Sequence, residues 1–174
     1  NNGRLAHAFL LTGIRGVGKT TTARIIAKAL NCVSDGNKKE PTFEICNKCS
    51  PCKSINNGNF LDVIEVDAAS RTGVDGIREI IDSVMYSTNN ARYKVYIIDE
   101  VHMLSNAAFN ALLKTLEEPP QNVKFIFATT EIKKIPATII SRCQKFDLQR
   151  VDIETLTKHL DRICKAENIS YENN

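Results

Sequence analysis

Apolar segments that favour β-strands alternate along the chain with segments that have helical periodicity. The apolar segments are AFLL (8–11), FLDVIEV (60–66), YKVYIID (93–99), KFIFATT (124–130) and KFDL (145–148). Helical spacing follows four of them, at 19–30, 74–84, 106–117 and 136–141. Apolar strands that alternate with helices are typical of a parallel sheet covered by helices on both faces. The pattern therefore predicts an α/β fold.

The segment 106–117 is the clearest of the predicted helices. Ser105 is placed to cap its first turn, and Pro119 and Pro120 follow its end. Its apolar residues share one face, which we expect to pack on the core: Phe109, Leu112, Leu113 and Leu116.

The alternation stops after Leu148. Asp152 is placed to cap an amphipathic helix with no strand after it, and the apolar positions of this helix are Ile153, Leu156, Leu160 and Ile163. We therefore expect one domain over 1–149, followed at 150–174 by the start of a second, helical unit that this sequence does not complete.

The stretch 31–59 breaks the alternation inside the first domain. It is long and polar, and a structureless loop of this length is uncommon in a compact domain. Within it, CNKCSPC (46–52) places three cysteines two residues apart. The spacing by itself is compatible with a disulfide, a redox centre or a metal site, and three thiolates are one short of a closed zinc shell.

A phosphate-binding loop is predicted at GIRGVGKT (13–20), which follows a strand and begins a helix. In this motif, backbone N–H groups surround the phosphates and the lysine adds a positive charge. The residues expected to bind the nucleotide are Gly13, Ile14, Arg15, Gly16, Val17, Gly18, Lys19, Thr20 and Thr21.

Two acidic residues complete the predicted catalytic site. The strand VYIIDE (95–100) ends in Asp99 and Glu100. We expect Thr20 and Asp99 to hold Mg²⁺, and Glu100 to polarise the attacking water. Glycines in an ordinary turn and acids kept for solubility are a poorer explanation, because both motifs occur in the right order and context. The sequence thus predicts nucleotide hydrolysis, with Lys19, Asp99 and Glu100 as catalytic residues.

Composition and charge change this picture little. Hydrophobic residues make up 43% and charged residues 25% of the 174 residues, which are values of a globular protein. The net charge of +3 is too small to indicate nucleic-acid binding by itself. No apolar run approaches the ~20 residues that span a bilayer, so we expect no membrane partner.

The string DEVH (99–102) fits the DExH pattern of helicases, but longer strings favour another class of NTPase. They are GIRGVGKTTTAR, DAASRTGVD (67–75), IDEVHMLS (98–105), FNALLKTLEEPP (109–120), FATT (127–130) and SRC (141–143). With these strings the chain resembles the AAA+ clamp-loader ATPases, and among them the bacterial gamma/tau family. The resemblance implies a five-stranded sheet in the order 5-1-4-3-2 and, from residue 150, the beginning of the helical lid.

The resemblance also implies roles for residues that chemistry alone leaves undefined. Thr130 matches the polar sensor of the γ-phosphate, and Arg142 matches the arginine finger that acts in trans on the next subunit's ATP. Residues at two helix N-termini match positions that contact the DNA backbone, although ordinary helix caps explain them as well: Ser70, Arg71, Thr72 and Ser105. The lid's sensor arginine and part of the adenine-covering segment are expected beyond Asn174 and before Asn1.

By the same resemblance, ATP binding and hydrolysis, with Mg²⁺, drive the loading of a sliding clamp onto primer-template DNA. The implied partners are the delta and delta-prime subunits, further gamma/tau copies, the clamp, and DNA through its backbone. Any polymerase activity would belong to the holoenzyme, because the chain has no acidic polymerase site. Two other functions remain open: a helicase, which would displace strands, and a zinc-dependent DNA-binding module, which would tolerate loss of Glu100.

A cytoplasmic location, implied by the resemblance, bears on the cysteines. Cytoplasmic thiols stay reduced, so metal is favoured over a disulfide. Cys32 would then supply the fourth ligand beside Cys46, Cys49 and Cys52, in the place where the gamma/tau family carries a four-cysteine zinc module. Four thiolates leave no open position, so this zinc would be structural and would order residues 31–59. Unliganded thiols are the alternative. Residues without partners at ligand spacing are interpreted as packing or isolated residues: Cys143, Cys164, His7, His102 and His159.

Overall fold

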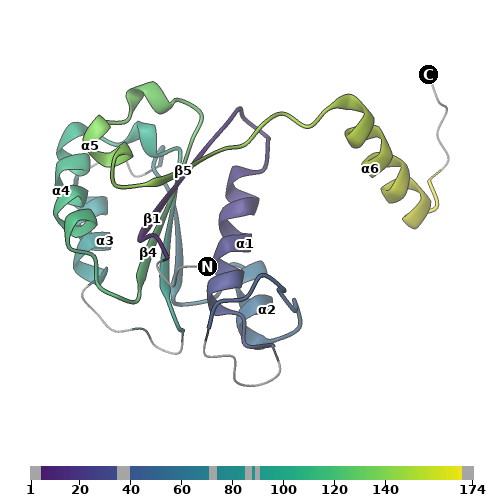
Figure 1. Ribbon diagram of the computed structural model, residues 1–174, viewed down its shortest axis with the longest axis horizontal. Coiled ribbons are helices and arrows are strands. Elements are labelled where there is room, and N and C mark those ends of the chain that lie inside the picture. Colours follow the sequence, from purple (N-terminus) through teal and green to yellow (C-terminus); the bar gives the residue numbers. More distant parts are fainter. Residues whose placement is uncertain (1–4, 35–39, 71–73, 85–87, 89–90, 170–174) are drawn as a thin grey trace.

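Five parallel strands form a single sheet at the centre of the molecule (Figure 1). The structure, a computed structural model, describes residues 5–34, 40–70, 74–84, 88 and 91–169. The strands are β1 (Ala8–Thr12), β2 (Val63–Asp67), β3 (Lys94–Asp99), β4 (Val123–Thr129) and β5 (Gln144–Asp147). Their order is β2-β3-β4-β1-β5, and every neighbouring pair is parallel. The predicted α/β class and the sheet order 5-1-4-3-2 are confirmed.

Side chains of the central strands alternate between two hydrophobic layers, because successive residues of a strand point to opposite faces. On β3, Tyr96 and Ile98 belong to one layer, whereas Val95 and Ile97 belong to the other. All seven residues of β4 are buried, as expected for a strand covered on both faces.

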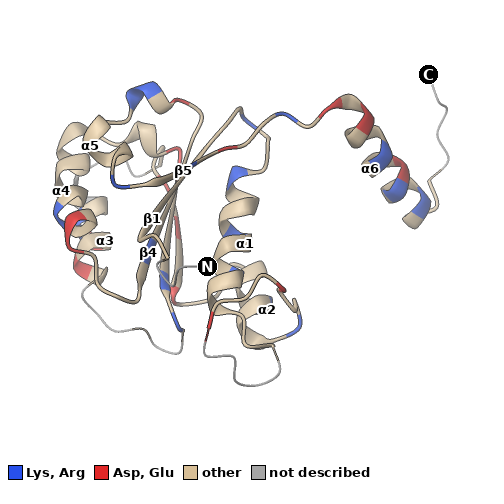
Figure 2. Cartoon of the chain, viewed as in Figure 1, with Lys and Arg blue, Asp and Glu red and all other residues tan. Residues whose placement is uncertain are grey.

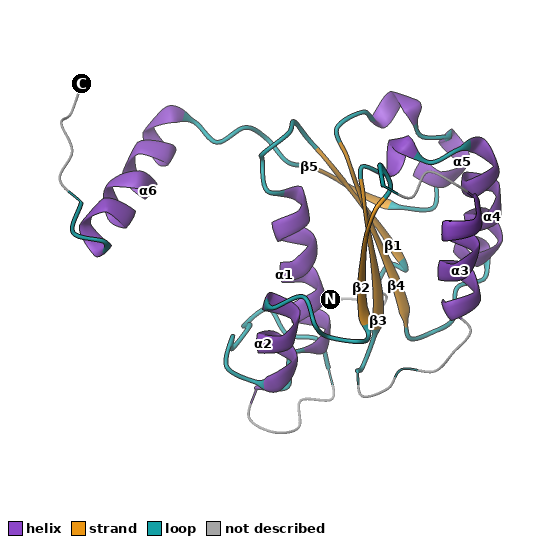
Figure 3. Ribbon diagram, turned by 180° about the vertical axis from the view of Figure 1, so that it is seen from behind, coloured by secondary structure: helices purple, strands orange, loops and turns teal. Residues whose placement is uncertain are grey.

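Helices cover both faces of the sheet (Figure 3). One face carries α1 (Lys19–Asn31) and α2 (Ser50–Asn56). The other carries α3 (Val74–Val84), α4 (Asn106–Glu117) and α5 (Ala137–Ile140). Two short 3₁₀ helices, η2 (Val101–Met103) and η3 (Ile132–Lys134), follow β3 and β4.

Helix α4 confirms the prediction made from its sequence. The Ser105 hydroxyl accepts a hydrogen bond from the Ala108 N–H at 3.2 Å, which caps the helix. Phe109, Leu112 and Leu116 are buried in the layer that α4 covers.

Helix α6 (Ile153–Ala166) lies apart from the sheet (Figure 1). Asp152 caps it, as predicted, by accepting the Thr155 N–H at 2.8 Å. Charges of both signs are interspersed along it (Figure 2). Its predicted apolar positions are all exposed: Ile153, Leu156, Leu160 and Ile163. That a second unit begins at residue 150 stays a prediction.

The stretch 31–59 contains a helix that the sequence did not predict. Helix α2 begins right after Cys49, and its Ile55 is buried in the same layer as Ala27 and Leu30 of α1. In the described part of the chain, no helix combines the length and apolar composition needed to cross a bilayer.

Candidate functional site

The loop between β1 and α1 has the backbone conformation of a phosphate-binding loop. Gly13 has φ 149° and Gly18, at the N-cap of α1, has φ 93°, in a region that side chains disfavour. A Cβ on Gly13 would lie 2.6 Å from the Leu148 carbonyl oxygen. The close approach of the chain after β5 therefore requires glycine at this position.

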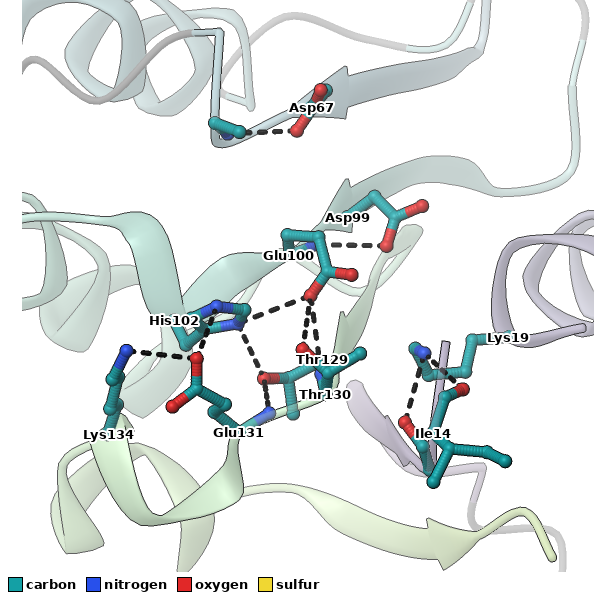
Figure 4. A network of polar contacts seen from close by, with 12 residues as sticks. Ile14, Lys19, Asp67, Asp99, Glu100, His102, Thr129, Thr130, Glu131 and Lys134 are labelled. Carbon is teal, nitrogen blue, oxygen red and sulfur yellow. Dashed lines mark hydrogen bonds and ion pairs between the residues drawn. The ribbon is translucent and has the colours of Figure 1, made fainter. Parts of the chain in front are cut away.

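Lys19 and Thr20 begin α1 directly after this loop. Lys19 is 6% exposed, and its Nζ donates to the carbonyl oxygens of Gly13 and Ile14, both at 3.0 Å. The ammonium is thus held inside the loop (Figure 4). The N-terminus of α1 adds the favourable field that helix ends present to anions.

Asp99 and Glu100 reach the same place from the end of β3. The Thr20 hydroxyl donates to Asp99 Oδ2 at 2.5 Å, and the Glu100 N–H donates to Asp99 Oδ1 at 2.9 Å. A hydroxyl and a carboxylate in contact are the oxygen donors that Mg²⁺ takes in nucleotide sites, so these residues fit the ion.

The loop and the strand end enclose a pocket of about 340 Å³. It is lined by Arg15, Gly16, Gly18, Lys19, Thr20, Thr21, Asp99 and Glu100. The lining includes most of the predicted nucleotide-binding residues, but not Gly13, Ile14 or Val17. Gly13 instead packs against Leu148, and Ile14 is 48% exposed.

Thr130 lies beside Glu100, one residue beyond the end of β4. Its N–H and its hydroxyl donate to Glu100 Oε2 at 3.3 and 3.1 Å. The sequence placed Thr130 at the last position of the strand and predicted no partner for it. The contact arises because β3 and β4 are neighbours in the sheet, so their carboxyl ends meet.

His102, which the sequence left without a role, is the residue that motif reasoning missed. Its ring lies between Glu100, Thr129 and Glu131 (Figure 4). The available signal was its place three residues after Asp99, within DEVH (99–102) and IDEVHMLS (98–105), to which we assigned no role for the histidine.

Arg142 lies between α5 and β5. It is not among the described residues that line the pocket. Its guanidinium donates to the Thr138 carbonyl oxygen at 2.7 Å through Nη1 and to Glu117 Oε1 at 2.6 Å through Nη2. Its role in trans stays a prediction.

The four residues predicted to contact DNA are only partly described. Arg71 and Thr72 lie outside the described residues. The Ser70 hydroxyl donates to the Asp67 carbonyl oxygen at 2.9 Å, and Ser105 caps α4. Both serines therefore have the local partners expected of turn and cap residues.

The four predicted zinc ligands form a cluster at the end of α1. The sulfur atoms of Cys32, Cys46, Cys49 and Cys52 all lie within 4.8 Å of one another, and those of Cys32 and Cys46 are 3.6 Å apart. A tetrahedron with Zn–S bonds of ~2.3 Å separates its sulfurs by ~3.8 Å, so the cluster fits zinc.

Backbone N–H groups support a thiolate in this cluster. Lys48 and Cys49 donate to Cys46 Sγ at 3.5 and 3.3 Å and lower the pKa of this thiol to about 6. Burial raises the pKa of the Cys52 thiol in the same cluster, and burial against the core raises the pKa of Cys143 to about 12. Cys143 is distinguished by its place, because it packs against the core and is not one of the four clustered cysteines.

The phosphate loop, the acidic strand end and the strand order define an AAA+ P-loop fold. A solved structure described as a DNA polymerase III gamma subunit-related protein from Thermotoga maritima has a TM-score of 0.58 and 22% identity, over 86% of this chain and 43% of that one. The RuvB Holliday junction branch migration motor of the same organism has a TM-score of 0.60 and 18% identity, over 97% and 46%. At these identities, the likeness concerns the fold alone.

The family follows from sequence comparison. A family model described as DNA polymerase III, delta subunit, matches residues 1–152, and the chain belongs to this family. It is 54% identical to the DNA polymerase III subunit tau of Bacillus subtilis over 97% of this chain and 29% of that protein. It is 56% identical to the gamma subunit of Buchnera aphidicola from Acyrthosiphon pisum, over 96% and 45%. The resemblance to the gamma/tau family is confirmed, and the chain spans less than half the length of these relatives.

Proposed function

We propose that the chain is the ATP-hydrolysing domain of a DNA polymerase III clamp-loader subunit, converting ATP to ADP and phosphate. The observation that carries this proposal is the convergence of Lys19, Thr20, Asp99 and Glu100 on one pocket. The names of the relatives support the placement in DNA replication.

Each residue of the pocket has a separate task in this proposal. Lys19 and the N-terminus of α1 bind the phosphates, and Thr20 and Asp99 hold Mg²⁺, which neutralises charge on the β- and γ-phosphates when bound. Glu100 orients the attacking water and accepts its proton. Thr130 contacts Glu100 directly, which supports a link between the γ-phosphate sensor and the water-activating group.

Arg142 acts on a neighbouring subunit in this proposal. It lies outside its own pocket and its side chain is 34% exposed. An arginine is always charged and its planar fork contacts two phosphate oxygens at once, which suits it to this task.

The proposed partners are the delta and delta-prime subunits, further gamma/tau copies, the sliding clamp and the backbone of primer-template DNA, all in the cytoplasm. Zinc at the four cysteines has a structural role. Ser70, Arg71, Thr72 and Ser105 are the proposed DNA contacts.

Reconstitution with candidate partner subunits tests the function. We expect ATP turnover that rises when clamp and primed DNA are both added, and no displacement of a strand from duplex DNA. ATP turnover that stays the same when clamp and primed DNA are added would refute the clamp-loader proposal. Strand displacement would favour a helicase.

A further inference from the structure

His102 is a buried imidazole next to the water-activating carboxylate, and the mechanism above gives it no task. Its side chain is 6% exposed. Nδ1 lies 3.0 Å from Thr129 Oγ1 and 3.3 Å from Glu100 Oε2, and Nε2 lies 3.4 Å from Glu131 Oε1. The ring therefore connects the segment after β3 with the segment after β4.

Glu100 needs such a contact because its backbone leaves the strand. It has φ 45° and ψ 45°, the left-handed conformation that is unfavourable for a residue with a side chain, and it precedes η2. Since β3 has ended at Asp99, the regular geometry of the sheet no longer fixes the direction of the Glu100 side chain.

Glu131 orients the ring from the other side. An ionised carboxylate only accepts hydrogen bonds, and each ring nitrogen faces one: Nε2 faces Glu131 and Nδ1 faces Glu100. When both nitrogens carry a proton, both are donors and the ring donates to the two carboxylates. The contact of Nε2 with Glu131 then sets the direction in which Nδ1 meets Glu100.

The contacts on the Glu100 carboxylate converge on one oxygen. In the described part of the chain, His102 Nδ1 and both the N–H and the hydroxyl of Thr130 approach Oε2. The other oxygen points away from His102 (Figure 4). One oxygen is held by protein groups while the other remains for water.

We propose that His102, oriented by Glu131, is a positioning residue that fixes the Glu100 carboxylate for water activation. This inference rests on the proposed ATPase function and adds the residues that control the geometry of its base. His102 is not among the described residues that line the pocket, so it acts through Glu100.

The test compares two substitutions of His102 in the full-length protein within the reconstituted complex. His102→Leu keeps most of the volume and removes the polar atoms, so we expect kcat to fall about tenfold, with KM and ATP affinity within about twofold of wild type. His102→Asn keeps a donor near the position of Nδ1 and should recover most of the turnover. Equal turnover in the two variants would mean that the residue only fills space, and would overturn the proposal.

Glu131 and Lys134 provide a matched pair of controls. Glu131→Ala should lower kcat in the same direction as His102→Leu, because the ring loses its anchor. Lys134→Ala removes an ion pair to the same Glu131 oxygen, at 2.9 Å, but leaves the carboxylate that faces His102, so it should lower kcat less than Glu131→Ala does. A loss in Lys134→Ala as large as that in Glu131→Ala would contradict the proposed path.

A second measurement does not depend on turnover. The ¹⁵N resonances of the His102 ring should shift in Glu100→Gln and Glu131→Gln, and less in Lys134→Ala. Unchanged resonances in Glu100→Gln overturn the inference even if the complex hydrolyses ATP. If the wild-type complex does not hydrolyse ATP, the proposed function is refuted. The positioning role of His102 in water activation is then refuted as well, even where the resonances shift.

Discussion

At the scale of single residues, the two carboxylates at the end of β3, Asp99 and Glu100, lie in different surroundings although they are adjacent in sequence. Asp99 contacts the hydroxyl of Thr20, whereas Glu100 contacts Thr130 and the ring of His102. In the proposed function, Asp99 holds the metal ion and Glu100 activates the water, so nucleotide binding and turnover depend on different carboxylates.

Substitutions of Lys19 and Glu100 should separate the same two steps. Lys19→Ala removes the charge that meets the phosphates, so we expect ATP binding to be lost. Glu100→Gln keeps the shape of the side chain but not the base, so it should bind ATP and reduce turnover by about 10² or more. Nucleotide titration and steady-state hydrolysis measure the two effects. Wild-type turnover in Glu100→Gln would remove Glu100 from the mechanism.

Local motifs predicted Lys19, Thr20, Asp99 and Glu100, because each motif lies within a few consecutive residues. Local motifs did not predict the contacts that Thr130 and His102 make with Glu100. These contacts depend on β3 and β4 being neighbours, which the family resemblance implied but hydrophobic periodicity does not.

At the scale of elements, periodicity predicted α3 and α4 with the bounds that the structure has. It missed α2, because this helix has only seven residues and two buried side chains, Cys52 and Ile55. So short a helix is marginal by itself. Its packing on α1 and the cysteine cluster beside it stabilise it, and neither is visible in the periodicity.

Metal removal should therefore loosen α2 before the rest of the domain. We expect the purified chain to contain about one zinc, and serine at Cys32, Cys46, Cys49 or Cys52 to lower this content. Elemental analysis measures the metal, and hydrogen exchange should increase over 40–59 in these variants and after chelation.

Cys143→Ser is the matched control for these variants. Cys143 lies outside the cluster, so its replacement should leave both the zinc content and the exchange over 40–59 unchanged. Protein that is purified without chelator and contains no zinc would contradict the metal site.

At the scale of the whole molecule, Arg142 is not among the described residues that line the nucleotide pocket. Arg142 is held by Glu117 and the Thr138 carbonyl oxygen, outside the pocket lining. A single chain cannot use this arginine on its own nucleotide while these contacts persist. Turnover should therefore depend on assembly.

Arg142→Ala should leave ATP affinity and the low turnover of the isolated chain unchanged. In the complex, the same change should depress DNA-stimulated hydrolysis, because a trans arginine in related NTPases contributes about 10³ or more in rate. Mixing mutant subunits with partners whose own ATP sites are disabled locates the defect.

Lys145→Ala serves as the control for Arg142, since it removes a neighbouring positive charge that pairs with Asp147. It should behave as wild type in both assays. An equal loss of turnover in the isolated chain and in the complex for Arg142→Ala would show action in cis or through folding.

Helix α1 joins two sites, because Lys19 begins it and Cys32 follows its last residue. Its thirteen residues span ~20 Å, and one inserted residue would advance one end by ~1.5 Å and turn it by ~100° relative to the other. Either Lys19 would leave the phosphate-binding loop, or Cys32 would move away from the other three cysteines of the cluster. We therefore expect no insertion or deletion between Lys19 and Cys32. The stretch between Cys32 and Cys46 can change in length at little cost in loop-closure entropy.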